Sequence, residues 1–172
     1  MKKNGLMVYL LLLVCQLTLA SENAHLGENT EWDDEQSAII EVSRWVALAP
    51  KEAGFQAYSD LFHPDFTNWY MAGDEKSVRG RDEYLSLVKD WLEAGNHATY
   101  SEVTPVSVDV IGDIAYIRQI KEEHFHHPDG PPTMFIGHFA SLMKKYKGKW
   151  TFYRTSFETR YRGPRASYEP SE

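Results

Sequence analysis

Hydrophobic residues recur at helical spacing through the first half of the chain. Apolar side chains three and four positions apart predict one helix that stops by Pro50 and a second helix between Pro50 and Pro64. A third helix is predicted between Gly80 and Gly95, because a glycine suits the residue that follows a helix. Between the second and third helices, residues 66–71 carry the aromatic side chains that are typical of a short strand.

From Thr99 onward, the hydrophobic pattern changes from helical spacing to alternation, which indicates strands. The predicted strands cover residues 106–110, 114–126, 133–146 and 150–159. Turn-forming residues at 128–132 and at 147–148 are expected to join the last three strands as successive hairpins. The chain therefore predicts an α+β fold in which three N-terminal helices pack on one face of a curved antiparallel sheet.

The N-terminus has a different pattern, because residues 6–20 are almost wholly apolar and follow Lys2 and Lys3. Small residues at the end of this run, just before Ser21, are typical of a cleavable secretory signal peptide. The alternative is a membrane anchor, but the run is short against the roughly 20 residues that span a bilayer. We predict a signal peptide over residues 1–20 and a periplasmic or secreted mature protein.

The rest of the chain is expected to form one domain. Residues 21–30 are polar and aperiodic and are predicted to be a flexible lead-in, the domain covers residues 31–160, and residues 161–172 form a polar tail. Signal cleavage would remove Cys15, the one cysteine of the chain. The mature protein is therefore expected to have no disulfide, no zinc–thiolate site and no cysteine nucleophile.

The charge of the chain argues against polyanionic partners. The formal net charge is −7 at pH 7, and the loss of Lys2 and Lys3 would make it −9. An acidic surface repels the phosphates of nucleic acids and anionic lipids. We therefore expect no nucleic-acid partner and, after signal cleavage, no membrane partner.

Four short segments carry a resemblance to a known family. They are Leu61–Phe66 (LFHPDF), Val78–Tyr84 (VRGRDEY), Gly112–Tyr116 (GDIAY) and Gly148–Phe152 (GKWTF). In this order, after two helices, they resemble the nuclear transport factor 2-like superfamily and are similar to its SnoaL-like, ketosteroid-isomerase-like bacterial branch. The resemblance covers about residues 31–160. It implies a cone-shaped sheet with a deep apolar pocket at the open end, and frequent homodimers.

This resemblance leaves three functions open, because a fold does not determine an activity. The superfamily includes isomerases, cyclases, dehydratases and epoxide hydrolases, and also proteins that only bind ligands. The first hypothesis is a domain that holds a small, mostly apolar molecule, and the second is a cofactor-independent acid–base enzyme of the isomerase, dehydratase or hydrolase type. The third is a dimerising interaction module. The sequence contains no nucleophile elbow, phosphate-binding glycine loop or zinc-protease motif.

The hairpin around residues 128–132 carries the densest group of polar candidates. A register that sets His126 opposite Met134 would place Glu122 opposite His138, with His124 on the same face. A histidine beside a carboxylate can act as a general base with its orienting partner. Three histidines and a glutamate can also bind a transition metal, and residues at a hairpin tip are often merely solvated. We predict neither a metal nor a cofactor.

Asp65 is the candidate base that the resemblance implies, since an acidic residue near this position often faces the family's cavity. Its alternative role is turn chemistry after a helix. With Tyr116 as the hydrogen-bond donor to a developing oxyanion, the predicted catalytic residues are Asp65, His138 and Tyr116. The predicted ligand-binding residues are Trp69, Glu122, His124 and Trp45.

Overall fold

The computed structural model of the protein describes residues 31–70 and 78–168. The predicted signal peptide and lead-in, and the last four residues of the predicted tail, lie outside the described residues, so export stays a prediction. Within the described residues, no helix is both long enough and apolar enough to cross a membrane.

Within residues 31–70 and 78–168, four helices precede or interrupt the sheet: α2 (Asp34–Trp45), α3 (Ala49–Glu52), α4 (Gly54–Ser59) and α5 (Arg81–Glu93). Helix α2 begins with a capping box, in which the Asp33 carboxylate accepts from the Gln36 amide at 2.8 Å and the Gln36 side chain accepts from the Asp33 amide. The prediction of a single helix between Pro50 and Pro64 is wrong. Gly54 has a φ of +86°, which breaks that segment into α3 and α4.

Six strands form one sheet in the order β2-β1-β6-β5-β4-β3. Their bounds are Phe62–Tyr70 (β1), Val78–Gly80 (β2), His97–Ile111 (β3), Ile114–His126 (β4), Thr133–Tyr146 (β5) and Lys149–Pro164 (β6). A short 3-10 turn, Arg165–Ser167, follows β6. The predicted antiparallel meander is confirmed for β3 to β6, and the α+β class with it. One pair differs from the prediction, because β1 runs parallel to β6 and makes the sheet mixed.

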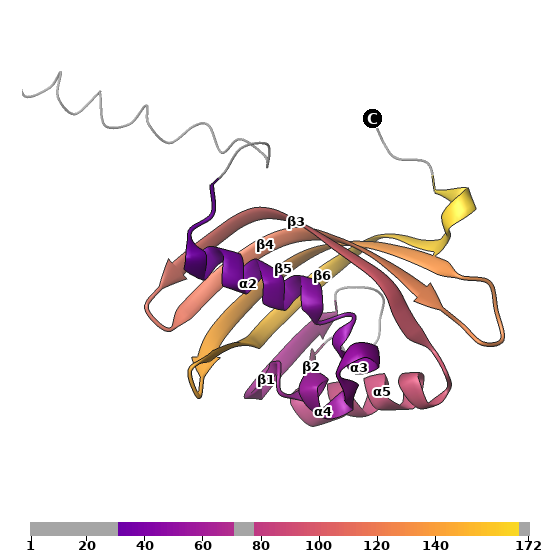
Figure 1. Cartoon of the computed structure of the whole chain (residues 1–172), viewed down its shortest axis with the longest axis horizontal. Coiled ribbons are helices and arrows are strands. Elements are labelled where there is room, and N and C mark those ends of the chain that lie inside the picture. Colours follow the sequence, from indigo (N-terminus) through magenta and orange to yellow (C-terminus); the bar gives the residue numbers. More distant parts are fainter. Residues whose placement is uncertain (1–30, 71–77, 169–172) are drawn as a thin grey trace, which may run out of the picture. The chain divides into compact units, whose positions relative to one another are not determined.

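The helices cover one face of the curved sheet, with α2 lying across the long strands and α5 beside β1 (Figure 1). Side chains alternate along β4, so that Ala115 and Ile117 are buried beneath the helices while Tyr116 is exposed on the other face. We call these the inner and outer faces of the sheet. The most deeply buried hydrophobic side chains are Ile39, Ala49, Ala115, Ile117 and Met143.

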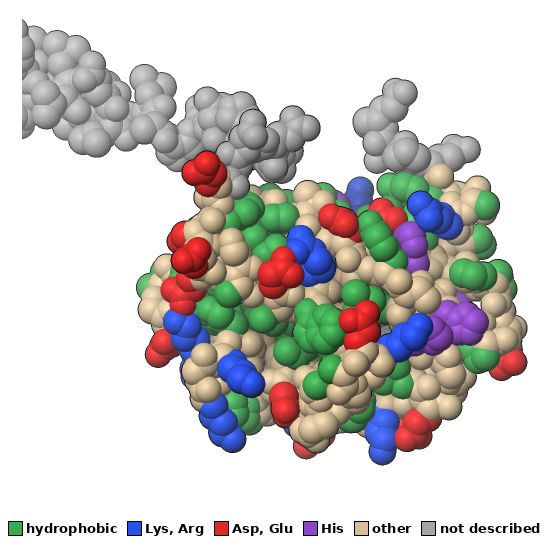
Figure 2. Space-filling model, in the orientation of Figure 1, with side chains coloured by type: hydrophobic (Ala, Val, Ile, Leu, Met, Phe, Trp, Pro, Cys, Tyr) green, Lys and Arg blue, Asp and Glu red, His purple; other side chains and the backbone are tan. Residues whose placement is uncertain are grey.

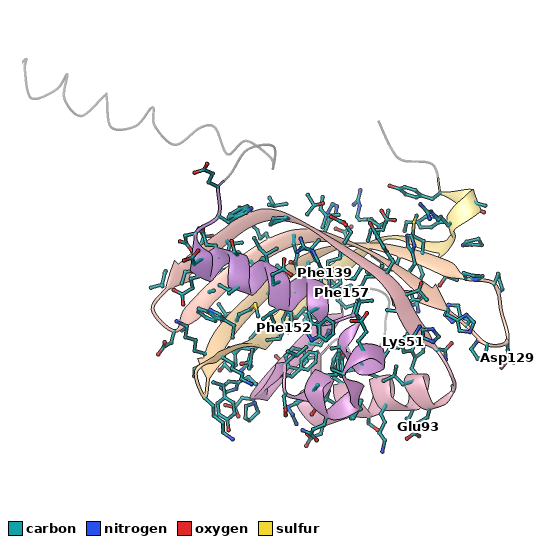
Figure 3. The ribbon with its side chains drawn as sticks, viewed as in Figure 1. Lys51, Glu93, Asp129, Phe139, Phe152 and Phe157 are labelled. Atoms are coloured by element: carbon teal, nitrogen blue, oxygen red, sulfur yellow. The ribbon has the colours of Figure 1, made fainter. Side chains whose placement is uncertain are left out.

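Side chains divide between the interior and the surface in the way this two-layer arrangement requires. Phe139 and Phe157 point into the space between the sheet and the helices, whereas Lys51 and Asp129 lie at the outside (Figure 3). On the face of the molecule seen in Figure 2, acidic and basic side chains are interspersed around apolar side chains near its middle. The sheet and the helices therefore enclose an aromatic interior.

Candidate functional site

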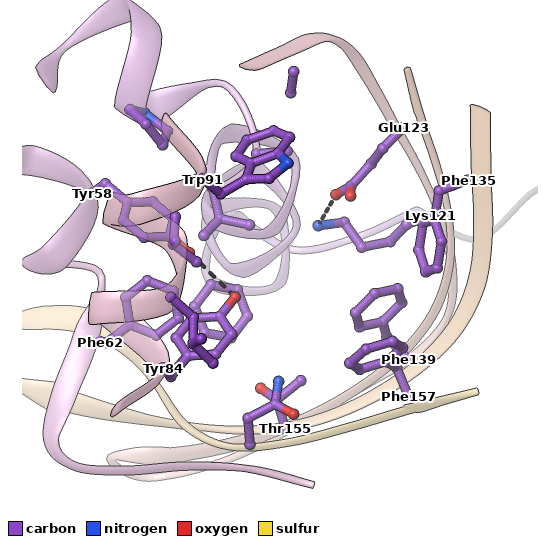
Figure 4. A pocket seen from close by; sticks show the side chains of 18 of the residues that line it. Tyr58, Phe62, Tyr84, Trp91, Lys121, Glu123, Phe135, Phe139, Thr155 and Phe157 are labelled. Carbon is purple, nitrogen blue, oxygen red and sulfur yellow. Dashed lines mark hydrogen bonds and ion pairs between the residues drawn. The ribbon is translucent and has the colours of Figure 1, made fainter. Parts of the chain in front are cut away.

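A cavity of about 500 Å³ lies between the inner face of the sheet and helices α4 and α5. Figure 4 shows its two sides, with the helix side and β1 facing the inner positions of β4, β5 and β6 across open space. Most of the side chains that line it are aromatic or aliphatic. We refer to this space as the cavity.

One wall of the cavity is a cluster of aromatic rings centred on Phe62 of β1. Its ring lies 4.9 Å from that of Tyr58, 4.8 Å from Phe66, 5.3 Å from Tyr84 and 5.7 Å from Phe152, measured between ring centroids. Phe62, Phe66 and Phe152 are at most 5% exposed. The cluster joins α4, α5, β1 and β6, so it both fixes the helices on the sheet and forms the apolar wall.

The opposite wall is formed by Phe135 and Phe139 of β5 with Phe157 of β6, where Phe139 and Phe157 stack at 4.9 Å. Gly137 lies between Phe135 and Phe139 on the inner face. A Cβ atom at Gly137 would lie 2.5 Å from the Phe135 ring and 2.8 Å from the Phe139 ring. The two rings can therefore close over the backbone only because residue 137 has no side chain.

A charged pair, Lys121 and Glu123 of β4, lies in this apolar surrounding. The Lys121 Nζ atom is 2.8 Å from Glu123 Oε1, and their side chains are 4% and 13% exposed. The ammonium also lies 5.3 Å from the centre of the Phe139 ring. Because the residues are two apart on a strand, both point to the inner face, and Figure 4 shows the ammonium directed into the cavity. Attraction between buried charges of this kind offsets part of their desolvation.

Two phenols face this pair across the cavity (Figure 4). The Tyr58 hydroxyl donates to that of Tyr84 at 3.2 Å. Burial raises the pKa of both phenols above its usual value, and the Glu123 carboxylate adds to the rise in each pKa. They therefore stay protonated across the physiological range and act as neutral hydrogen-bond donors.

Raised phenol pKa values predict a loss of stability in alkaline solution. Above the usual phenol pKa of about 10, the unfolded chain loses these protons while the folded chain keeps them, so stability falls as the pH rises toward the folded pKa values. We expect the free energy of unfolding, measured by urea titration, to fall by about 1 kcal/mol or more between about pH 9 and pH 11. Tyr58→Phe should flatten this dependence, and an equally steep fall in that variant would contradict the prediction.

Gln119, next to Lys121 on the inner face, leaves a polar atom without a partner. Its side-chain amide nitrogen donates to the Ser43 hydroxyl of α2, while Oε1 is buried and has no partner among the described residues. The residue is 2% exposed and lines the cavity. A buried acceptor without a partner is unfavourable, so Gln119 Oε1 carries a cost in the protein alone.

The predicted pairing of the β4–β5 hairpin is wrong by two residues. His124, rather than His126, lies opposite Met134, and His138 lies opposite Ile120 instead of Glu122. A shift of two residues preserves the face, so these residues do share one face as predicted. That face is the outer one, and His138 is exposed there.

The three predicted catalytic residues do not meet in the cavity. Tyr116 is 40% exposed and, like His138, belongs to the outer face, while the Asp65 side chain is 75% exposed. The Asp65 backbone amide donates to His63 Nδ1 at 3.1 Å, so this local contact is made by the His63 side chain and not by the Asp65 carboxylate. The expectation that these groups converge in one closed space is corrected, because strand alternation turns them away from the helices.

The four predicted ligand-binding residues also lie outside the cavity lining. On the outer face, Glu122 Oε1 is 2.6 Å from His124 Nε2, and the His124 ring stacks on that of Tyr100. Trp69 is 52% exposed and borders a shallow outer groove together with Tyr116, whereas Trp45 packs against the core. Within residues 31–70 and 78–168, no group of three or more potential ligands is placed to hold a metal ion.

The polar residues that line the cavity were not predicted from the sequence. Gln119, Lys121 and Glu123 alternate along β4 in phase with the apolar residues Ala115 and Ile117. This shared phase is the sequence pattern that could have indicated that they point to the inner face. The homodimer also stays a prediction, and the outer face carries exposed apolar side chains that would suit it, among them Trp69, Tyr116 and Ile120.

Comparison with known proteins identifies relatives by family and by fold. Residues 41–157 match the model of a family described as a SnoaL-like domain, and no curated protein matches the chain significantly. A solved structure of a conserved protein from Planctomyces limnophilus is similar to the chain, with a TM-score of 0.62, 18% identity, and 73% of this chain and 97% of that chain covered. A ketosteroid isomerase-like protein from Erwinia carotovora atroseptica has a TM-score of 0.58 and 18% identity, with 76% and 99% covered. At these identities, the two structures show a shared fold.

Proposed function

The chain belongs to the SnoaL-like domain family, and on that basis we propose that it binds a small, flat, mostly apolar molecule in the cavity. The observation that carries this proposal is the cavity itself, whose volume of about 500 Å³ falls within the range of small-molecule sites. Its aromatic walls suit a flat ligand, because rings stack or meet edge to face at low cost.

A few polar groups converge on this apolar space, as they do in sites that orient a ligand. The Tyr84 hydroxyl accepts from Tyr58, and no protein acceptor among the described residues takes its proton. Lys121 supplies further donors. A bound molecule with one polar end would therefore satisfy groups that are unpaired in the protein alone.

A neutral fluorescent probe tests the proposal. We expect N-phenyl-1-naphthylamine, which brightens in apolar surroundings, to bind the folded protein in a saturable way. Gly137→Ala should weaken this binding about tenfold, because the new methyl group pushes the Phe135 and Phe139 rings into the cavity. The titration is followed by probe fluorescence, with circular dichroism confirming that both proteins are folded.

Gly130→Ala is the matched control, since a Cβ at Gly130 has its nearest neighbour at an ordinary 3.8 Å, in His127. This variant should bind the probe like the wild type. Absence of saturable binding by the folded wild type would overturn the proposed function.

A second candidate, acid–base catalysis without a cofactor, is favoured by one arrangement in the same cavity. Glu123 supplies a carboxylate that can accept a proton, and the protonated Tyr84 can donate to a developing oxyanion. Recovery of the natural ligand chemically unchanged, by mass spectrometry after incubation with the protein, would argue for binding alone.

A further inference from the structure

Basic side chains outnumber acidic ones in the lining of the cavity, although the chain as a whole is acidic. Among the described residues that line it, Arg79, Lys121 and Arg162 are cationic, and Glu123 is the one carboxylate. Arg79 pairs with Glu83 of α5 at 3.9 Å and Arg162 is exposed, so Lys121 is the one buried cation of this lining. The formal net charge of the chain is −7. The buried Lys121 ammonium is therefore the charged group that bears most directly on what the cavity can hold.

The Lys121 ammonium is the cation best placed to contact such an occupant. The residue is 3% exposed, and its ammonium has three N–H groups, of which the Glu123 carboxylate at 2.8 Å can take one. The Phe139 ring packs beside it. Figure 4 shows the ammonium on the sheet side of the open space, directed toward the helix side. Its other N–H groups are thus available to a molecule in the cavity.

The chemistry of a buried ammonium selects what it binds. A neutral apolar ligand would displace water from these N–H groups and leave them unpaired, which is costly. A cationic ligand would bring a second positive charge against the Lys121 ammonium. An anionic oxygen restores the lost hydrogen bonds as charge-assisted ones, which are about twice as strong as neutral ones.

We infer that the ligand of the cavity is a flat organic acid, whose anionic oxygen binds the Lys121 ammonium while its rings lie between the aromatic walls. This inference rests on the proposed function, because it names the chemical class of the molecule held there. Glu123 acts as a positioning residue, since it holds the ammonium at the edge of the open space.

A pair of probes with the same naphthalene ring and similar size, one anionic and one neutral, tests the inference. The probes are 2-naphthoate and 2-naphthamide, titrated calorimetrically at neutral pH and fixed ionic strength. We expect the wild type to bind the acid at least about tenfold more tightly than the amide, as a charge-assisted contact would give. The double variant Lys121→Met/Glu123→Gln, which leaves no unpaired buried charge, should lose most of this preference while keeping its affinity for the amide.

Lys51→Met is the matched control, because Lys51 is an exposed lysine of α3 outside the cavity lining. It should keep the full preference for the acid. Equal binding of acid and amide by the wild type, or an unchanged preference in the double variant, would overturn the inference and leave the proposed function standing. Failure of both probes to bind would overturn the two together.

Discussion

Lys121→Met is expected to lower the free energy of unfolding by about 3–5 kcal/mol, the range measured when one partner of a buried ion pair is removed. Methionine nearly preserves the volume and apolar contacts of the lysine stem, so packing changes little. The loss arises because the Glu123 carboxylate, whose side chain is 13% exposed, is left without the ammonium that lies 2.8 Å away. Urea denaturation followed by tryptophan fluorescence measures the effect.

Two comparisons separate this effect from a general response to losing a lysine. Adding Glu123→Gln to Lys121→Met should restore most of the stability, because neither member of the buried pair then leaves its partner charged and alone. Lys89→Met breaks the exposed Lys89–Glu93 pair on α5 and should cost less than about 0.5 kcal/mol. A loss at Lys121 as small as the loss at Lys89 would show that the buried pair contributes little.

Phe62→Ala is expected to destabilise the protein by about 3–5 kcal/mol, the usual cost of deleting a buried aromatic ring. The ring is 5% exposed and touches four other aromatic rings that come from α4, α5, β1 and β6. Its removal opens a void where the helices meet the sheet and also enlarges the cavity. Chemical denaturation gives the loss in stability, and the neutral probe shows whether binding changes with it.

Trp69→Ala serves as the control for Phe62→Ala, since it removes a larger ring that is 52% exposed on the outer face. It should cost clearly less stability than Phe62→Ala. If both variants lost the same stability, the aromatic cluster around Phe62 would not be the centre of the core.

The sequence pattern predicted the order of helices and strands well, because period and turn residues are local properties. It could not decide which face of β4 is the inner one. The inner positions carry Gln119, Lys121 and Glu123, while Tyr116 and Ile120 stand on the outer face. Hydrophobicity alone favours neither set. The predicted site residues of β4 therefore fall on the outer face, which the helices leave open.

The register of the β4–β5 hairpin could not be predicted from local sequence patterns, for a different reason. The last residue pair is Phe125 with Thr133, so the connection is longer than the turn residues at 128–132 indicate. His127 hydrogen-bonds to the Asn96 side chain and to the Thr133 hydroxyl, each at 2.8 Å. The first of these contacts reaches residues just after α5, and such long-range bonds do not follow from turn chemistry.

Because β1 pairs in parallel with β6, β1 can join the sheet only after β6 has been synthesised. Phe62 is in register with Phe152, and more than half of the described residues lie between them in sequence. Closing so long a loop is slow, because its entropy is lost before the contact forms. While the polypeptide is being synthesised, the helices and the hairpins of β3 to β5 can form early, but the aromatic wall has to wait for β6. A nascent chain that ends before Lys149 therefore has no place to hold a ligand.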